Sequence, residues 1–452
     1  MTVTRRQLDA ALGLTLTDEQ WAAVSASVDP AVIVAGAGSG KTTSMAARVA
    51  WLVGSGIARA DGVLGLTFTT KATSALLTSM RRALAAMAEQ GLVETADDDG
   101  NPLGEPQVLT YHAFAARIVG EHGIRLGREP GATMLTDGAR QQLAYRVVCR
   151  TGLPLSSFGR SPVSITSDLL RLDDELTELG ISPDDLRAFD LEMLAMLHSF
   201  ETLQAVGRDM RSTSTQRSVL AELVSQWRAE KAARDVLDFA DQIRLAGEIV
   251  GRFGDVVADL CGRYPVVLLD EYQDTSIAQR VLLQRIFGEG HAVMAVGDPC
   301  QAIYGWRGAS VDNIESFPQH FPVLGVDGAG RRPAARFTLS QNRRSGPQIL
   351  EVANRTSADL RLVHSGVEPL RAGDNGKGSG HVACALFDTS RQEADWLVQQ
   401  VAATHSAEVP WSAIAVLAAT GRDLVVVDTA LRRSGVPTVS YTHLTLPTNR
   451  EV

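Results

Sequence analysis

Four short apolar runs divide the chain, and each ends in small or polar residues. They lie at residues 31–34, 63–67, 266–269 and 292–296. Apolar runs of this length predict buried parallel strands. Helix-like stretches lie between them, for example at 41–53 and 71–87, so the alternation is typical of an open α/β sheet. Such sheets bind ligands at the carboxyl ends of their strands, where the polar signatures of this chain fall.

The segment between residues 116 and 234 has a different pattern. Its apolar positions recur with helical periodicity, and Ser182 followed by Pro183 is typical of a helix start. We interpret this segment as a helical insertion that interrupts the α/β domain. A Gly-, Pro- and Arg-rich stretch at 327–336 separates that domain from another. The second domain is indicated by strand-like runs at 381–386 and 413–417 and by a helix-like run at 391–403.

The composition excludes disordered and fibrous proteins. The 452 residues, 45% hydrophobic and 21% charged, are enough for about three globular domains. Lys+Arg 43 against Asp+Glu 52 gives a net charge of −9, so a nucleic-acid partner would need a local basic groove. The four cysteines are scattered without metal-ligand spacing, which argues against a disulfide framework or a zinc cluster. No apolar run reaches the length of a membrane span, so we expect no membrane partner and a cytoplasmic protein.

A glycine-rich segment follows the first apolar run and opens a helix. It reads Ala35-Gly36-Ala37-Gly38-Ser39-Gly40-Lys41-Thr42. In this context the backbone N–H groups face phosphates, Lys41 neutralises the β/γ charge, and the Thr42 hydroxyl binds Mg²⁺. Ala35 stands where the general pattern has glycine. An ordinary glycine-rich turn is the alternative, and the preceding strand and the Lys-Thr ending both argue against it.

Two acidic residues follow the third apolar run. They open the sequence Asp270-Glu271-Tyr272-Gln273-Asp274. In a nucleotide hydrolase Asp270 would hold the metal ion and Glu271 would polarise the attacking water. The alternative is that the two acids merely cap a following helix, which the presence of the phosphate loop disfavours. Together the two segments indicate a nucleoside triphosphatase and nothing more specific.

Further motifs carry a resemblance to a known family. In chain order they lie at residues 16–20, 66–72, 110–114, 237–239, 270–274 with Gln279, 296–309 and 342–345. Their order and spacing over residues 16–350 resemble the superfamily 1 DNA helicases of the UvrD/Rep/PcrA type. The resemblance implies an α/β fold: a P-loop NTPase (RecA-like) parallel sheet with an inserted helical subdomain and an incomplete second α/β motor domain. The implied boundaries are 1–115 with 235–330 for the first motor domain, 116–234 for the insertion, and 331–452 for the second motor domain.

The resemblance implies further residues around ATP. Gln20 would read the adenine edge, although by itself it is also compatible with a surface helix. Gln301 would sense the γ-phosphate and couple it to the DNA track. Arg344 would contact the γ-phosphate from the second motor domain, because a guanidinium suits charge that spreads over the equatorial oxygens. Arg343 stands where the family usually has a stacking tyrosine, so a guanidinium face would replace it and nucleotide selectivity would be loose.

The resemblance also implies a path for single-stranded DNA. Aromatic side chains suit a motor that reads no particular sequence, because every base can stack. The expected DNA-binding residues are Phe68, Thr69, Lys71, Thr110, His112, Tyr304, Trp306 and Arg307. For an isolated aromatic residue a core position is the alternative, which the Tyr-Gly-Trp-Arg-Gly run at 304–308 disfavours for Trp306.

The resemblance implies, for the intact protein, a helicase that uses ATP and Mg²⁺ to move 3′ to 5′ along single-stranded DNA. It would unwind duplex at single-strand/double-strand junctions in DNA repair or recombination, with protein partners unknown. The family's later motifs, one with a second arginine, are not found, and the residues from about 440 look foreign to the family. We therefore interpret the chain as a truncated fragment that binds Mg-ATP without DNA-stimulated hydrolysis or unwinding. The alternative is a non-motor fragment that binds ATP and DNA without turnover.

Overall fold

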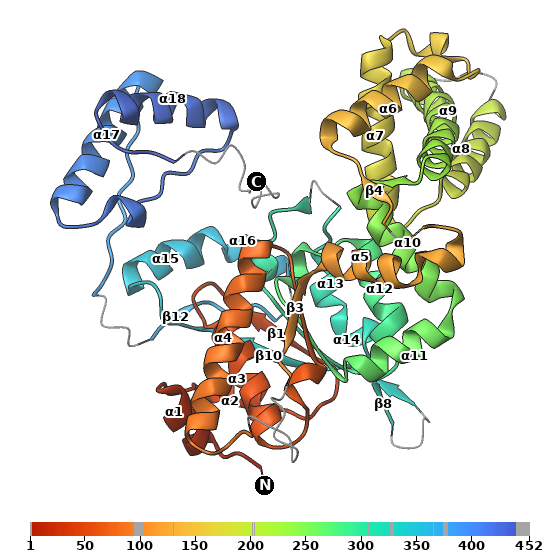
Figure 1. Ribbon diagram of the computed structural model, residues 1–452. Helices are drawn as coiled ribbons and strands as arrows, with labels where there is room; N and C mark the ends of the chain where they lie inside the picture. Colours follow the sequence, from red (N-terminus) through yellow and green to blue (C-terminus); the bar gives the residue numbers. More distant parts are fainter. Residues whose placement is uncertain are drawn as a thin grey trace. The chain divides into compact units, whose positions relative to one another are not determined.

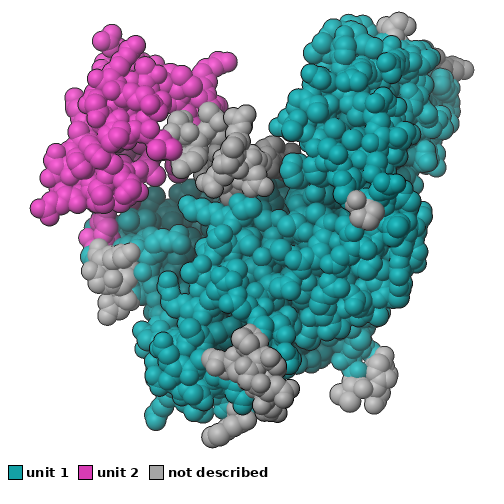
Figure 2. Space-filling model, viewed as in Figure 1, with its two compact units in different colours: residues 1–378 teal, residues 379–452 magenta. Residues whose placement is uncertain are grey.

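The computed structural model forms two compact units, Met1–Gly378 and Ser379–Val452 (Figure 2). It describes residues 2–94, 104–129, 131–200, 202, 204–305, 308–325, 330–364, 366–373 and 378–439. We describe each unit by itself.

A six-stranded parallel sheet forms the centre of the first unit. Its strands, in spatial order, are β10 (Ala335–Leu339), β1 (Ala31–Ala35), β7 (Ala292–Gly297), β6 (Val266–Leu269), β2 (Val63–Thr67) and β3 (Gln107–Thr110). Every neighbouring pair in this sheet is parallel. The four apolar runs of the sequence are β1, β2, β6 and β7, which confirms the predicted α/β fold class.

Helices cover both faces of this sheet, because alternate strand residues point to opposite sides. Val32 and Leu64 face one core, whereas Ile33 and Val63 face the other. The first core is closed by α5 (Tyr111–His122), α10 (Phe239–Arg252), α11 (Gly254–Arg263) and α12 (Ile277–Phe287). The second core is closed by α1 (Arg5–Leu12), α2 (Asp18–Val24), α3 (Lys41–Gly54) and α4 (Thr70–Glu89) (Figure 1). The result is a doubly wound sheet with the carboxyl ends of its strands along one edge.

The segment between α5 and α10 builds a separate helical core. Its helices are α6 (Asp137–Arg150), α7 (Pro162–Leu179), α8 (Pro183–His198) and α9 (Ala205–Ala233) (Figure 1). Ser182 caps α8 and Pro183 occupies its first turn, as the sequence predicts. The chain enters and leaves this segment through β4 (Thr133–Met134) and β5 (Val236–Leu237), which pair in parallel.

The strand β10 lies beyond the predicted boundary at residue 331 and belongs to the six-stranded sheet. Ala335 to Leu339 pair in register with Ala31 to Ala35 of β1, so this segment completes the first sheet. Downstream of it, β11 (Gln341–Asn342) pairs with β12 (Arg371–Ala372), and α15 (Pro347–Thr356) and α16 (Ala358–Val363) follow β11. The compact unit therefore extends to Gly378. The division into motor domains and an inserted subdomain stays a prediction.

The second unit consists of helices in its described part. It contains α17 (Ser390–Ser406) and α18 (Gly421–Arg433), which share a small core around Val401 and Leu431. The helix predicted at 391–403 is confirmed, but the strands predicted at 381–386 and 413–417 are wrong. Among residues 378–439 neither run pairs with a neighbouring strand, and an unpaired strand leaves its backbone groups to solvent.

Candidate nucleotide and DNA site

The glycine-rich loop connects β1 to α3 at the carboxyl edge of the sheet. Gly40 takes the left-handed conformation at the N-cap of α3, and the Ser39 hydroxyl donates to the Gly36 carbonyl over 2.7 Å. Lys41 and Thr42 begin the helix, so both lie at its positive end. Anions are favoured at such a helix N-terminus.

Side chains from α2 and from the segment after β10 hold this loop. The buried Gln20 amide donates to the Ser39 carbonyl over 3.0 Å, and its oxygen accepts from the Thr17 backbone N–H. Asn342 donates to the Ala37 carbonyl, and the Arg343 backbone N–H donates to the Gly38 carbonyl over 2.9 Å. Gln20 and Asn342 therefore shape the loop, whatever further contact Gln20 makes with a nucleotide.

The two arginines predicted to contact ATP lie beside the same loop. The Arg343 guanidinium donates to the Thr15 carbonyl over 2.8 Å, and the Arg344 backbone N–H donates to Asn342 Oδ1 over 2.8 Å. Both side chains are exposed. Their predicted roles toward adenine and the γ-phosphate stay predictions.

Gly38 gives a test of how closely this loop is packed. Its φ is +71°, and a Cβ built there would lie 2.5 Å from Asn342 Nδ2. We expect Gly38→Ala to weaken Mg-ATP binding and to cost about 1–3 kcal/mol of stability, because the added methyl group would displace Asn342 from the loop in addition to the strain of a non-glycine residue in this conformation. Gly91→Ala is the matched control, since its φ is +68° and nothing lies within 4 Å of its built Cβ. Isothermal titration of both variants checks this, and equal Mg-ATP affinities would contradict it.

Lys41 and the acids after β6 meet at the loop. Lys41 Nζ lies 3.1 Å from Glu271 Oε2. Burial and the neighbouring Glu271 raise the pKa of Asp270 to about 6, against the opposing effect of Lys41. Burial also acts to raise the pKa of Glu271, but Lys41 and Gln273 outweigh it and hold that pKa below its ordinary value. Glu271 has a φ of +48°, and strain of this kind in a non-glycine residue is typical of functional sites.

A buried amide connects these acids to the end of β7. Gln273 Nε2 donates to Glu271 Oε2 over 3.0 Å, and Gln273 Oε1 accepts from the Asp298 backbone N–H over 3.0 Å. Asp298 in turn accepts a 2.6 Å hydrogen bond from Gln301 Nε2. The predicted sensor Gln301 is therefore connected to Glu271 through two residues, the Gln273 side chain and Asp298, whose backbone N–H and carboxylate make the two contacts.

Aromatic residues lie beyond the carboxyl ends of β2, β3 and β7. The Phe68 and Tyr304 rings stack with centroids 4.6 Å apart and planes at 29°. His112 makes an edge contact with Phe239, whose side chain is 57% exposed. Thr69 and Thr110 cap α4 and α5 by accepting backbone hydrogen bonds, and Lys71 is exposed. Trp306 and Arg307 lie outside the described residues, so those two contacts stay predictions.

Comparison with known proteins decides the family. The UvrD/REP helicase N-terminal domain matches residues 16–322, which is more than half of the chain. The chain belongs to the UvrD/REP helicase family. Relatives named as ATP-dependent DNA helicases align over most of the chain.

Three relatives illustrate the extent of the match within the UvrD/REP helicase family. The ATP-dependent DNA helicase PcrA of Leuconostoc citreum is 27% identical over 85% of this chain and 44% of its own length. UvrD2 of Mycobacterium bovis is 28% identical over 93% of this chain and 54% of its own length. PcrA of Staphylococcus epidermidis is 25% identical over 94% of this chain and 51% of its own length. The chain thus spans about half the length of these relatives.

Sequence reasoning missed three contributors to the site of this UvrD/REP family member. Gln273 lies inside the acidic motif, but its contacts with Glu271 on one side and Asp298 on the other form only when the chain folds. No local sequence pattern predicts them. Asn342 likewise contacts the loop from more than 300 positions away. Phe239 could have been found, since it is the one large aromatic residue in the 237–239 motif.

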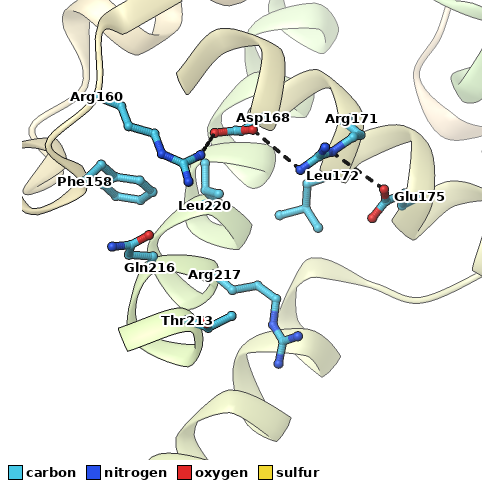
Figure 3. A pocket seen from close by; sticks show the side chains of 10 residues that line it. All are labelled: Phe158, Arg160, Asp168, Arg171, Leu172, Glu175, Thr213, Gln216, Arg217 and Leu220. Atoms are coloured by element: carbon cyan, nitrogen blue, oxygen red, sulfur yellow. Dashed lines mark hydrogen bonds and ion pairs between the residues drawn. The ribbon is translucent and has the colours of Figure 1, made fainter. Parts of the chain in front are cut away.

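A cavity in the helical segment is distinct from this site. It measures about 260 Å³ and lies between α7 and α9, far along the chain from the glycine-rich loop (Figure 3). Three arginines line it, and each pairs with a carboxylate: Arg160 with Asp168, Arg171 with Glu175, and Arg217 with Asp190. Because these charges are compensated, we assign no ligand to the cavity.

Within the described ranges, no helix is long and apolar enough to cross a bilayer.

Proposed function

We propose that this chain is the ATP-binding motor part of a DNA helicase that moves 3′ to 5′ along single-stranded DNA. The contact between Lys41 and Glu271 carries this proposal, because it brings the phosphate loop and the acidic motif into one site. The work of the motor would be unwinding at single-strand/double-strand junctions during DNA repair or recombination. A cytoplasmic location, expected from the sequence, is part of this proposal.

In this proposal the loop residues 35–42 bind the triphosphate of ATP. Lys41 would leave Glu271 and neutralise the β/γ-phosphates, which frees Glu271 to polarise the attacking water. Gln20 and Arg343 would contact the adenine side, and Gln301 and Arg344 would contact the γ-phosphate. Charge spread over the equatorial oxygens in the transition state favours a guanidinium at the last position.

Mg²⁺ fits the residues at this site. Asp270 is buried, and its raised pKa indicates a carboxylate whose negative charge is poorly compensated. The Thr42 hydroxyl lies at the start of α3, at the end of the loop that would carry the phosphates. Mg²⁺ is usually held by one or two protein oxygens together with substrate phosphates, which this pair would supply. The bound cation would neutralise charge on the transferring phosphate.

Single-stranded DNA would pass over the aromatic residues beyond the strand ends. The stacked pair Phe68 and Tyr304 offers a platform for a base, and His112 with Phe239 offers a second. Thr69, Lys71 and Thr110 would contact phosphates, as would Arg307. Such contacts bind without reading sequence, as a translocating motor requires.

Phosphate release measured with and without single-stranded DNA tests this proposal on the 452-residue chain. Stimulated release together with displacement of a strand from a 3′-tailed duplex would support the motor and would overturn the expectation, drawn from the sequence, that this chain binds Mg-ATP without DNA-stimulated hydrolysis. Binding of both ligands without stimulated release would agree with that expectation and favour the alternative, a non-motor module. Failure to bind either ligand would contradict both.

We expect Tyr304→Ala to weaken binding of single-stranded DNA by about 1–3 kcal/mol, the usual contribution of one stacked base. Tyr304→Phe keeps the ring, so its DNA affinity should stay near that of the unchanged chain. Fluorescence anisotropy with a labelled oligothymidylate measures both. If Tyr304→Ala and Tyr304→Phe bind DNA equally well, the ring belongs to the internal packing of the loop.

A further inference from the structure

We propose that Gln273 and Asp274 are positioning residues that couple nucleotide binding to the DNA-binding loop. This inference rests on the function proposed above. In this inference the two residues transmit a change at Lys41 to the loop that contains Tyr304. The change is the transfer of Lys41 from Glu271 to the phosphates of ATP. The juxtaposition that supports it is a continuous set of hydrogen bonds, buried at its centre, from Glu271 to the backbone beside Tyr304.

The first part of the connection runs between two carboxylates. Gln273 Nε2 donates to Glu271 Oε2 over 3.0 Å and to Asp274 Oδ2 over 3.1 Å. Gln273 is 1% exposed, and its hydrogen bond with Asp274 is buried. A Cβ built on Gly297 would lie 2.3 Å from Gln273 Oε1, which indicates how tightly the amide is enclosed. A change in the position of Glu271 therefore changes the hydrogen bonding of this amide.

The second part runs from Asp274 to the aromatic loop. The other oxygen of Asp274, Oδ1, accepts from the Ile303 backbone N–H over 3.3 Å. Ile303 directly precedes Tyr304, whose ring stacks on Phe68. Asp274 is 7% exposed, and each of its two oxygens has one donor in this connection.

The far end of the aromatic loop is fixed to the same segment. The Ser310 backbone N–H donates to the Thr275 carbonyl over 3.1 Å, and Ala309 forms a bridge with Ser276. Residues 274–276 therefore hold the loop at both ends. A displacement of this segment moves the whole stacking platform, which a contact at one end alone would not do.

Lys41 supplies the two states that coupling requires. In the structure it pairs with Glu271, whereas a bound triphosphate would draw it to the β/γ-phosphates. Glu271 then loses its contact with Lys41, and the hydrogen bond with Gln273 becomes the main remaining contact of its carboxylate. Binding of ATP thus changes the contacts of Glu271 at one end of the connection, and binding of DNA changes the contacts of Tyr304 at the other end. Each ligand therefore changes the affinity for the other by the same factor.

Asp274→Asn breaks this connection with almost no change of shape. The two donors face different oxygens of Asp274, so in asparagine the NH₂ group replaces the acceptor opposite either Gln273 or Ile303 and places donor against donor there. Gln273→Met breaks the same hydrogen bond from the opposite side. Asp312→Asn, which makes the same charge change at an exposed position, is the matched control.

The test measures the affinity for a labelled oligothymidylate with and without Mg²⁺ and the β,γ-imido analogue of ATP. For the unchanged chain and Asp312→Asn we expect the analogue to change DNA affinity by about 5- to 150-fold, the usual range of such coupling. For Asp274→Asn and Gln273→Met that ratio should fall close to one in a folded chain that still binds each ligand. A purely structural role would instead weaken both single-ligand affinities and lower the melting temperature.

Several results would overturn the inference. A folded Asp274→Asn or Gln273→Met chain that keeps the full ratio would exclude coupling through this pair. Loss of the folded state in both variants would assign the pair to stability. A ratio of one in the unchanged chain would also exclude it, whereas failure of that chain to bind ATP or DNA at all would contradict the proposed function itself.

Discussion

Lys41→Ala should lose most of the affinity for Mg-ATP, and with it any hydrolysis. Lys41 Nζ is the charge that the loop presents beside Glu271, and hydrogen bonds to charged groups contribute about 1.5–3 kcal/mol each. The expected loss of affinity is therefore about 10- to 150-fold. Equilibrium titration with a fluorescent ATP analogue in the presence of Mg²⁺ measures it.

Glu271→Gln is the companion variant. It removes the carboxylate proposed to polarise water, but it leaves Lys41 and the buried Asp270 in place. We expect Mg-ATP to bind with near-normal affinity and turnover to be lost. Normal ATP affinity in Lys41→Ala, or normal turnover in Glu271→Gln, would refute the assignment of these roles.

Lys231→Met should destabilise the first unit by about 3 kcal/mol, the lower end of the usual cost of breaking a buried pair. It leaves three buried carboxylates with one cation fewer, and an arginine still pairs with each of them. Lys231 is 1% exposed, and its Nζ lies 2.7 Å from Asp241 Oδ2, 2.8 Å from Asp238 Oδ2 and 3.4 Å from Asp173 Oδ2. These contacts join α9 to α7 and to the start of α10. Burial acts to lower the pKa of Lys231, but the three carboxylates outweigh it and raise that pKa.

Urea denaturation followed by circular dichroism tests this expectation. Arg355→Met is the control, since the exposed pair of Arg355 with Glu351 should contribute no more than about 1 kcal/mol. Adding Asp241→Asn to Lys231→Met should recover part of the lost stability, because it removes one of the three carboxylates that have lost Lys231 and leaves two, although Asp241 also pairs with Arg244 over 2.7 Å. A shift of Lys231→Met no larger than that of the control would show that the cluster is not a stabilising junction.

The inner strands could be predicted from the sequence, whereas the edge strands could not. The four inner strands are β1, β2, β6 and β7. They are buried on both faces and therefore appear in the sequence as continuous apolar runs. The strands β3 and β10 lie at the two ends of the sheet and include polar residues such as Gln107 and Arg336. Their partly exposed positions remove the apolar signal, so the sequence pattern does not show that β10, beyond the predicted boundary at residue 331, pairs with β1.

The site shows the same division between local and long-range information. The glycine-rich loop and the acidic pair are contiguous in sequence, so their order after two apolar runs was enough to suggest a nucleotide site. The contacts of Gln273 with Asp298, and of Asn342 with Ala37, join segments 25 and 305 positions apart. Nothing in the local pattern of either segment encodes such a contact, which depends on how the strands are ordered in the sheet.

The most direct test of the central claim is equilibrium binding of the β,γ-imido analogue of ATP to the 452-residue chain in Mg²⁺. The account predicts saturable binding at one site, competition by ATP, loss in Lys41→Ala, and retention in Tyr304→Ala. Binding that is absent, or that is unchanged in Lys41→Ala, would contradict the claim that the loop before α3 is the ATP site of this helicase family member.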